Sequence, residues 1–165
     1  CETLSSLSAY QTAQVVMAYV HSRSEVRTET LIRDLLAGDK TTVIPYCDGD
    51  DLIPWRLTDW SELVIGAFGI LEPRAELRNL HERNVAPDEI DLIRVPALAF
   101  DQAGHLFGSG RAYYDLLLPQ LPPVAIKVGL SYDCQIVPQL PTEKHDVPMD
   151  LVITEANRTH VGQSL

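Results

Sequence analysis

Runs of apolar residues alternate with polar segments along the chain, and six of these runs are long enough to contribute strands. They lie at residues 13–20, 41–46, 63–71, 90–100, 122–130 and 149–154. The first run is nearly continuous and rich in β-branched residues, which is typical of a central parallel strand that is covered on both faces. The pattern therefore predicts several strands that share one buried sheet.

A helix is predicted between the first two runs. Thr28 is suited to the N-cap, Glu29 lies in the first turn, and Gly38 is suited to the position after the last turn. Apolar residues between them recur at helical spacing and line one face, namely Leu31, Ile32, Leu35 and Leu36. The next run, 41–46, is bent at Pro45. Strand, helix and strand in this order predict a right-handed βαβ unit, and the fold class is an α/β three-layer sandwich with a mostly parallel sheet.

Two segments carry weaker patterns. Residues 47–60 are acidic and contain both tryptophans, and their spacing matches no calcium-binding loop, so we expect irregular solvated structure there. Residues 75–84 are polar apart from two leucines, and either a short helix or an irregular excursion of the chain is expected there.

Polar residues follow the apolar runs at four places, namely Glu25, Glu72, Asp101 and Ser131. In open parallel sheets, ligands bind beyond the carboxyl ends of the strands. These four side chains are therefore predicted to converge on one rim of the sheet.

Composition narrows the classes of function. The chain has 165 residues, of which 45% are hydrophobic, and a single domain spanning 1–165 is expected. Its formal net charge is −10, so it offers no broad basic face to a nucleic-acid backbone, and nucleic acid is not an expected partner. No apolar run has the length of a membrane span, and no membrane partner is expected. The three cysteines (Cys1, Cys47 and Cys134) lack disulfide or metal spacing, which fits a reducing cytoplasm.

The stretch from 95 to 118 carries the most specific pattern. An apolar strand leads to a polar turn at 101–104, a loop with Gly108 and Gly110, and a helix that Pro119 ends. A strand that feeds a glycine loop and then a helix start offers free backbone N–H groups to an anion. Arg111 adds a positive charge, so phosphate is the expected ligand of this loop. An ordinary strand-to-helix turn remains the alternative on this pattern alone.

Several motifs in order resemble one family. They are Glu-Val-Arg-Thr at 25–28, Gly-Ile-Leu-Glu-Pro at 69–73, Pro-x-x-x-Phe-Asp at 96–101, Tyr-Tyr-Asp at 113–115, and a tail with Gln, Pro, His-Asp and Thr-Glu between 135 and 155. Together they resemble the 5-formyltetrahydrofolate cyclo-ligase family, also called methenyltetrahydrofolate synthetase. The resemblance extends from about residue 13 to residue 155.

The resemblance implies a fold like that of sugar-phosphate isomerases and CoA-transferases. It also implies ATP- and Mg²⁺-dependent cyclisation of 5-formyltetrahydrofolate to 5,10-methenyltetrahydrofolate, with release of ADP and phosphate. The expected partners are a folate and ATP, and the chain is expected to be a monomer or weak homodimer. Family members have an N-terminal basic helix that contacts the nucleotide phosphates. No such helix precedes this chain's first strand, and we expect further residues upstream.

The resemblance also assigns site residues. The implied ATP-binding loop consists of Leu106, Phe107, Gly108, Ser109, Gly110, Arg111, Ala112, Tyr113 and Tyr114. The implied folate contacts are Val20, Glu25, Ser109, Gly110, Arg111, Ala112 and Tyr113. Tyr113 and Arg111 are the implied catalytic residues, and Asp115 and Asp146 are the implied Mg²⁺ ligands.

The loop departs from the family pattern at some of these positions. Leu106 stands where the family usually has arginine, Ser109 stands at a basic or aromatic position, and Ala112 replaces the last glycine. Loss of one charged phosphate ligand costs about 1.5–3 kcal/mol, or about tenfold or more in affinity. The alternative function is therefore a non-catalytic paralogue that binds folate, nucleotide or a protein partner. A sugar-phosphate isomerase or transferase is a third option, but the chain lacks an evident acid–base pair for it.

Overall fold

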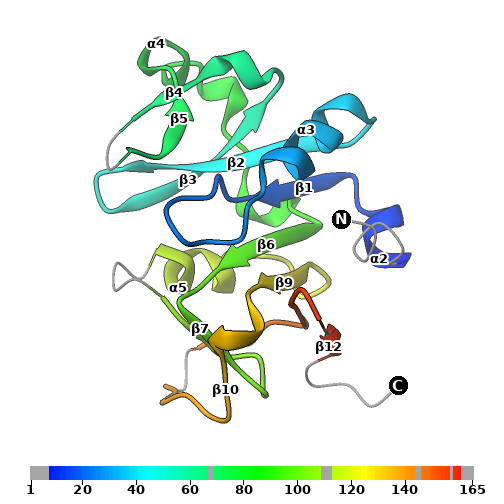
Figure 1. Cartoon of the computed structure of the whole chain (residues 1–165). Helices are drawn as coiled ribbons and strands as arrows, with labels where there is room; N and C mark the ends of the chain where they lie inside the picture. Colours follow the sequence, from blue (N-terminus) through cyan, green and yellow to red (C-terminus); the bar gives the residue numbers. More distant parts are fainter. Residues whose placement is uncertain (1–7, 67–68, 109–112, 144–145, 157, 161–165) are drawn as a thin grey trace.

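The central sheet of the protein has seven strands in the order β12-β11-β9-β6-β1-β2-β3 (Figure 1). This computed structural model describes residues 8–66, 69–108, 113–143, 146–156 and 158–160. The five inner strands are parallel, and β3 and β12 are antiparallel edge strands. The strands are β1 Val15–Ala18, β2 Thr41–Asp48, β3 Asp51–Leu57, β6 Leu92–Pro96, β9 Ile126–Leu130, β11 Leu151–Ile153 and β12 Arg158–His160. The expected mostly parallel sheet is confirmed.

The inner strands are buried on both faces. Alternate residues of β1 and β6 belong to two apolar clusters, so that Val16 and Leu92 face one side while Met17 and Ile93 face the other. Helix α3 (Glu29–Ala37) packs its apolar face into the first cluster. Helix α5 (Tyr113–Leu117) and the 3₁₀ turn η5 (Leu118–Gln120) contribute to the second. The sheet therefore lies between two helical layers, as the α/β three-layer prediction requires.

Shorter elements surround this sheet. Strands β7 (Ala99–Asp101), β8 (Leu106–Phe107) and β10 (Ile136–Val137) form a second sheet, and β4 (Leu63–Ile65) pairs with β5 (Leu71–Pro73). The remaining helical turns are α2 Ser8–Thr12, η1 Trp60–Glu62, α4 Ala75–Arg78, η3 His81–Arg83, η4 Pro87–Glu89 and η6 Asp133–Gln135. The short helix, one of the two alternatives expected within 75–84, is confirmed as α4. No helix in the part of the chain that the structure describes has the length and apolar character of a membrane span.

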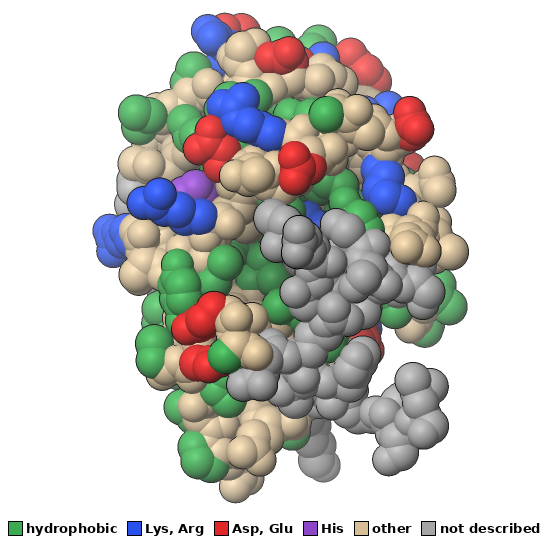
Figure 2. Space-filling model, turned by 45° about the vertical axis from the view of Figure 1, so that its right-hand side comes forward, with side chains coloured by type: hydrophobic (Ala, Val, Ile, Leu, Met, Phe, Trp, Pro, Cys, Tyr) green, Lys and Arg blue, Asp and Glu red, His purple; other side chains and the backbone are tan. Residues whose placement is uncertain are grey.

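The surface carries charges of both signs. Figure 2 shows one face of the molecule, on which Lys and Arg side chains are interspersed with Asp and Glu over the upper part. Hydrophobic side chains gather on the lower part of the same face. The mixed charges on this view agree with a chain whose acidic residues outnumber its basic ones, 23 to 13.

The prediction of irregular structure over 47–60 is wrong. β2 and β3 form a continuous antiparallel hairpin from Asp48 and Asp51 back to Thr42 and Leu57. Gly49, with φ of +60°, occupies the first position of its two-residue turn, where a positive φ favours glycine. The acidic residues cluster at the tip of the hairpin because the tip is exposed, and they do not prevent pairing.

Two apolar runs do not form single strands. The run 63–71 is divided between β4 and β5, which pair with each other outside the central sheet, and Gly69 has a φ of +75° in the turn between them. The run 90–100 is divided between β6 and β7, which belong to different sheets. After Pro96, the Leu98 amide donates to the Phe107 carbonyl over 2.8 Å, so the chain pairs with β8 instead of continuing along β9. Apolar composition predicts burial in both runs but does not locate the breaks.

A glycine allows the second sheet to pack against the first. Phe100, on β7, is fully buried. A Cβ atom at Gly129 of β9 would lie 2.6 Å from the Phe100 ring, closer than real Cβ contacts allow. The absence of a side chain at 129 therefore brings β7, and the turn that follows it, close against the central sheet.

One charged side chain lies inside the central sheet. Arg94, on β6, is only 1% exposed, and its Nε and Nη1 atoms have no hydrogen-bond partner. Its guanidinium lies 5.4 Å from the centroid of the Tyr10 ring, and it makes no ion pair with a carboxylate of the described residues. Burial lowers the pKa of Arg94 to about 10, so the group is still charged at neutral pH. Among the described residues this buried cation therefore has no carboxylate partner, and a hydrogen bond with Tyr10 only partly opposes the effect of burial on its pKa.

Replacing Arg94 by methionine is expected to stabilise the fold. The Arg94→Met variant removes the desolvation penalty of an unpaired charge and keeps most of the side-chain volume, so the free energy of unfolding should rise by about 1–3 kcal/mol. Urea unfolding monitored by circular dichroism would measure the change. Arg94→Lys, which keeps the charge but loses the ring contact, should not be stabilised. A less stable Arg94→Met protein would contradict the absence of a carboxylate partner for this guanidinium among the described residues.

Candidate active site

The loop that follows β1 is closed by hydrogen bonds between its two ends. The Thr28 hydroxyl donates to the Tyr19 carbonyl over 2.7 Å, and the His21 amide donates to the Thr28 hydroxyl oxygen over 3.2 Å. The Tyr19 hydroxyl donates to the Val26 carbonyl over 2.9 Å. Thr28 occupies the N-cap position of α3, as predicted, but its side chain serves the loop and makes no cap hydrogen bond.

This closed loop holds Glu25 at the carboxyl end of β1. One carboxylate oxygen, Oε2, accepts hydrogen bonds from the Ser22 amide over 2.7 Å and from the Ser22 hydroxyl over 3.3 Å. The other, Oε1, has no hydrogen bond to the described residues. Val20, the second predicted folate contact on this loop, is 7% exposed and packs in the core. Glu25 therefore combines a fixed oxygen with an open one, which suits it to accept N–H groups of a ligand.

The charge of this carboxylate acts on two tyrosines, Tyr19 and Tyr114. Burial, and next the charge of Glu25, raise the pKa of Tyr19 above its ordinary value, and Tyr132 acts on Tyr19 in the same direction. The same two leading causes raise the pKa of Tyr114 well above its ordinary value. Tyr19 and Tyr114 therefore stay protonated. Tyr114 belongs to α5, so the charge of Glu25 acts on a side chain that is 89 positions away in the sequence.

Tyr113 connects the start of α5 to the β2–β3 hairpin. Its hydroxyl donates to the Gly49 carbonyl at the hairpin tip over 3.2 Å. A cavity of about 290 Å³ lies between the hairpin and α5, and Tyr113, Leu52 and Leu116 contribute to its lining. The tyrosine implied to act near the reacting centre therefore lies where two elements meet beside a hollow.

The predicted phosphate loop is described only at its two ends. Leu106 and Phe107 form β8, Leu106 packs against the second apolar cluster, and Phe107 is 54% exposed. Gly108 follows, whereas Ser109, Gly110, Arg111 and Ala112 lie outside the described residues. Helix α5 has only five residues, so its dipole is small. An anion here would be bound chiefly by loop N–H groups and by Arg111.

The two predicted metal ligands come from different segments. Asp115 lies in the first turn of α5, is exposed, and makes no hydrogen bond or ion pair with the described residues. Asp146 is half-buried, and its Oδ2 accepts a hydrogen bond from the Glu143 amide over 2.7 Å. The described residues contain no cluster of three or more His, Cys, Asp or Glu side chains suited to a metal ion. The predicted Mg²⁺ site has only two carboxylate ligands, fewer than such a cluster requires. It stays a prediction.

The expected convergence of polar residues on one rim holds only in part. Glu25 and Ser131 lie at the carboxyl ends of β1 and β9. Glu72, in contrast, belongs to β5 outside the central sheet, where it is 8% exposed and forms an ion pair of 2.7 Å with Arg78. Its side chain also fills the space in which a Cβ at Gly66 would lie. The prediction for Glu72 is wrong because the run before it is not a strand of the main sheet.

Other residues at this rim are not singled out by the sequence pattern. Gln135 ties the loop after β9 to the crossing from β6 to β7, since its Nε2 donates to the Ala97 and Leu98 carbonyls over 3.2 and 3.1 Å. Its Oε1 accepts from the Tyr132 amide over 2.8 Å. Tyr19 sits inside an apolar run and is indistinguishable there from a core residue. The position of Gln135 in the tail motif is the signal that could have identified it.

Comparison with known proteins identifies the family. The family model of the 5-formyltetrahydrofolate cyclo-ligases matches residues 1–155. The chain belongs to the 5-formyltetrahydrofolate cyclo-ligase family. A cyclo-ligase of Haemophilus influenzae is 32% identical over 141 residues, which cover 83% of this chain and 73% of the relative. A cyclo-ligase of Escherichia coli strain K12 is 29% identical over 146 residues, which cover 86% of this chain and 78% of the relative.

Solved structures agree with this cyclo-ligase membership. The 5,10-methenyltetrahydrofolate synthetase of Aquifex aeolicus superposes with a TM-score of 0.81 at 32% identity, covering 99% of this chain and 81% of that one. A synthetase from Mycoplasma pneumoniae has the same fold, with a TM-score of 0.68 at 20% identity over 92% of this chain and 79% of that one. The predicted family, its fold class and its ligase character are thus confirmed for this cyclo-ligase homologue.

Proposed function

We propose that this protein catalyses the ATP- and Mg²⁺-dependent cyclisation of 5-formyltetrahydrofolate to 5,10-methenyltetrahydrofolate. The observation that carries the proposal is the match of the family model over residues 1–155, and it is supported by the Ser22 amide, which holds Glu25 after β1 through a hydrogen bond of 2.7 Å. Glu25 belongs to the motif implied to anchor folate, and Tyr114 is the last residue of the loop implied to hold phosphate. The two residues are 89 positions apart in the sequence, and the charge of Glu25 adds to burial in raising the pKa of Tyr114.

The chemistry requires activation of a poor leaving group. The γ-phosphoryl group of ATP is transferred to the formyl oxygen, N10 attacks the formyl carbon and loses its proton, and phosphate departs with that oxygen. Little side-chain acid–base chemistry is needed, because positioning and charge stabilisation supply most of the acceleration. Water must be excluded from the phosphorylated substrate.

Each proposed residue has a role in that scheme. Glu25 accepts N–H groups from the amino-pyrimidine edge of the folate, and Val20 provides an apolar contact. Arg111 and the loop from Leu106 to Tyr114 bind the nucleotide phosphates, and Tyr113 lies near the reacting centre. Asp115 and Asp146 suit Mg²⁺, which prefers carboxylate oxygens and takes its remaining ligands from water and phosphate. The metal would supply charge neutralisation on the phosphates.

A non-catalytic, folate-binding role is the second candidate, and the environment of Leu106 favours it. This side chain stands where the family usually has arginine, and it packs against the apolar cluster below β8. An apolar, partly buried leucine makes no charged contact with phosphate. The substrates, the cytoplasmic location and the state of monomer or weak homodimer belong to the proposal in either case.

The test is the appearance of methenyltetrahydrofolate absorbance. Purified protein is mixed with 5-formyltetrahydrofolate, ATP and Mg²⁺, and each component is omitted in turn. Product that requires all three, with one phosphate released per product, is the expected result. Protein that binds the folate but forms no product would overturn the cyclo-ligase proposal in favour of the binding role.

A further inference from the structure

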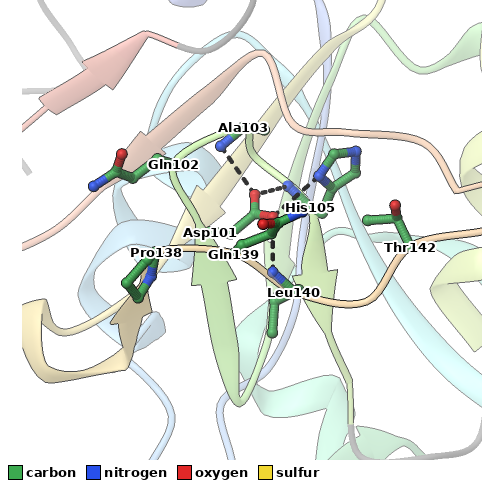
Figure 3. A pocket seen from close by; sticks show the side chains of 8 residues that line it. All are labelled: Asp101, Gln102, Ala103, His105, Pro138, Gln139, Leu140 and Thr142. Carbon is green, nitrogen blue, oxygen red and sulfur yellow. Dashed lines mark hydrogen bonds and ion pairs between the residues drawn. The ribbon is translucent and has the colours of Figure 1, made fainter.

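Asp101 is a buried carboxylate that the proposed chemistry does not use. It is 3% exposed and lies at the end of β7 (Figure 3). Its Oδ1 accepts hydrogen bonds from the Ala103 and His105 amides, each over 2.9 Å. Its Oδ2 lies 3.2 Å from His105 Nδ1 and accepts a hydrogen bond from the Leu140 amide over 3.1 Å. Burial alone would raise the pKa of Asp101, but the hydrogen bonds from Leu140 and His105 hold it below the ordinary value.

The carboxylate joins two segments, one of which leads to the predicted phosphate loop and the other to Asp146. The turn 101–105 leads directly into β8 and the predicted phosphate loop. The segment containing Leu140 leads, six positions later, to Asp146. The Met149 amide donates to the Gly104 carbonyl over 2.9 Å, so the same turn holds the chain on both sides of Asp146.

The two segments are separated by a hollow of about 340 Å³, which Gln102, Gln139 and Thr142 help to line. In Figure 3 the dashed bonds of Asp101 reach from the turn across to Leu140. Because packing between the segments is interrupted here, the charged hydrogen bonds contribute much of their alignment. Bonds to an ionised acceptor are stronger than neutral ones, and a buried donor left without its acceptor is costly.

We infer that Asp101 is a positioning residue that fixes β8, where the proposed phosphate-binding loop begins, relative to the segment that leads to Asp146. This inference rests on the proposed function, in which the loop binds ATP and Asp146 binds its Mg²⁺. The carboxylate touches neither ligand and acts through the backbone of both segments. Its loss should therefore weaken binding of the metal–nucleotide complex and leave the folate end of the site unaffected.

The test compares Asp101→Asn with a matched control. The amide replaces one acceptor oxygen by an NH₂ group, so at least one N–H of the cluster loses its partner. The control is Asp91→Asn at the opposite edge of the sheet, where one carboxylate oxygen accepts from the Gln14 and Val15 amides over 2.8 and 2.9 Å. Both changes remove one negative charge, but the amide oxygen of the control can still accept both backbone bonds, so the comparison isolates the effect of the bond lost at position 101. Calorimetry measures the Kd of ATP with Mg²⁺, and separately the Kd of 5-formyltetrahydrofolate.

Asp101→Asn is expected to raise the Kd of Mg·ATP about tenfold. The Kd of this variant for 5-formyltetrahydrofolate should stay within about twofold of the parent value. The Kd of Asp91→Asn for Mg·ATP should also stay within about twofold of the parent value. Equal nucleotide affinity in parent and Asp101→Asn, or equal weakening by Asp91→Asn, would overturn the inference alone. A parent that binds no Mg·ATP would overturn the proposed function and the inference together.

A measurement on the parent keeps the test independent of how the variant folds. Mg·ATP should slow amide hydrogen exchange in the peptide that contains Leu140, because the bonds of Asp101 couple this segment to the turn that leads into β8. Unchanged exchange in this peptide at saturating Mg·ATP would overturn the inference. Peptides of β3 and of α3 provide the reference for global stabilisation.

Discussion

The Asp115→Ala protein is expected to fold as the parent does and to lose ATP-dependent formation of methenyltetrahydrofolate by at least about 100-fold. Under the proposed function, this carboxylate is one of two that hold Mg²⁺ on the nucleotide phosphates. The side chain is exposed and makes no hydrogen bond or ion pair among the described residues, so its removal leaves no buried group unsatisfied. The loss should therefore appear in activity and in Mg²⁺-dependent ATP binding, with the unfolding midpoint unchanged.

Asp34→Ala is the matched control for this change. Asp34 is also an exposed aspartate on a helix, and its loss alters the net charge equally. Its helix, α3, covers the sheet without contributing a proposed ligand. Activity that survives in Asp115→Ala but not in Asp34→Ala would contradict the metal assignment. Equal retention of activity in both variants would contradict it as well.

Glu25→Gln is expected to raise the KM for 5-formyltetrahydrofolate between about 10- and 100-fold. The substitution turns charge-assisted hydrogen bonds to the pterin into neutral ones, at a cost of about 1.5–3 kcal/mol. The amide oxygen can still accept from the Ser22 amide, which now donates to Glu25 over 2.7 Å, so the loop keeps its closing bond. ATP affinity measured without folate should not change.

Glu89→Gln supplies the comparison for this prediction. Glu89 also accepts a hydrogen bond from the amide three residues before it, that of Ala86, over 3.2 Å. It lies in η4, which carries no proposed ligand contact. Steady-state kinetics at saturating ATP would separate the variants. A folate KM for Glu25→Gln within twofold of the parent would remove Glu25 from the substrate site.

Glu25→Gln also tests whether the charge of Glu25 raises the pKa of Tyr114. With the carboxylate charge gone, one cause of the raised pKa of Tyr114 disappears, whereas burial, the larger cause, remains. The Tyr114 pKa should therefore fall but stay above its ordinary value.

The parallel core of the fold could be predicted from the sequence because burial on both faces produces near-continuous apolar runs. β1 is the clearest case, since three of its four residues are buried. β3 was missed because it is an edge strand whose first residue and Arg56 are exposed, and because its acidic turn was interpreted as irregular. The turn signal was present in Gly49-Asp50, because glycine at the first position of a two-residue turn commonly connects the strands of a hairpin.

The sequence named individual candidate residues of the site, but it did not predict how they lie relative to one another. The motifs named Glu25 and Asp115 as separate candidates in the sequence. That the charge of Glu25 adds to burial in raising the pKa of Tyr114 depends on sheet order, which places β6 beside β1 although 76 positions separate their first paired residues, Val16 and Leu92. The order of residues along the chain does not show which distant residues lie close together in the fold. The failure at Glu72 has the same origin, because its run pairs locally and leaves the main sheet.

The contact between Phe100 and Gly129 constrains how this protein can change over generations. A methyl group at 129 would lie 2.6 Å from the ring, so a larger residue can enter there only after position 100 has become smaller. A smaller residue at 100 by itself leaves a cavity under the hairpin that leads to the phosphate loop. Substitutions at positions 100 and 129 are therefore coupled. A change at either position alone is expected to give a less stable protein.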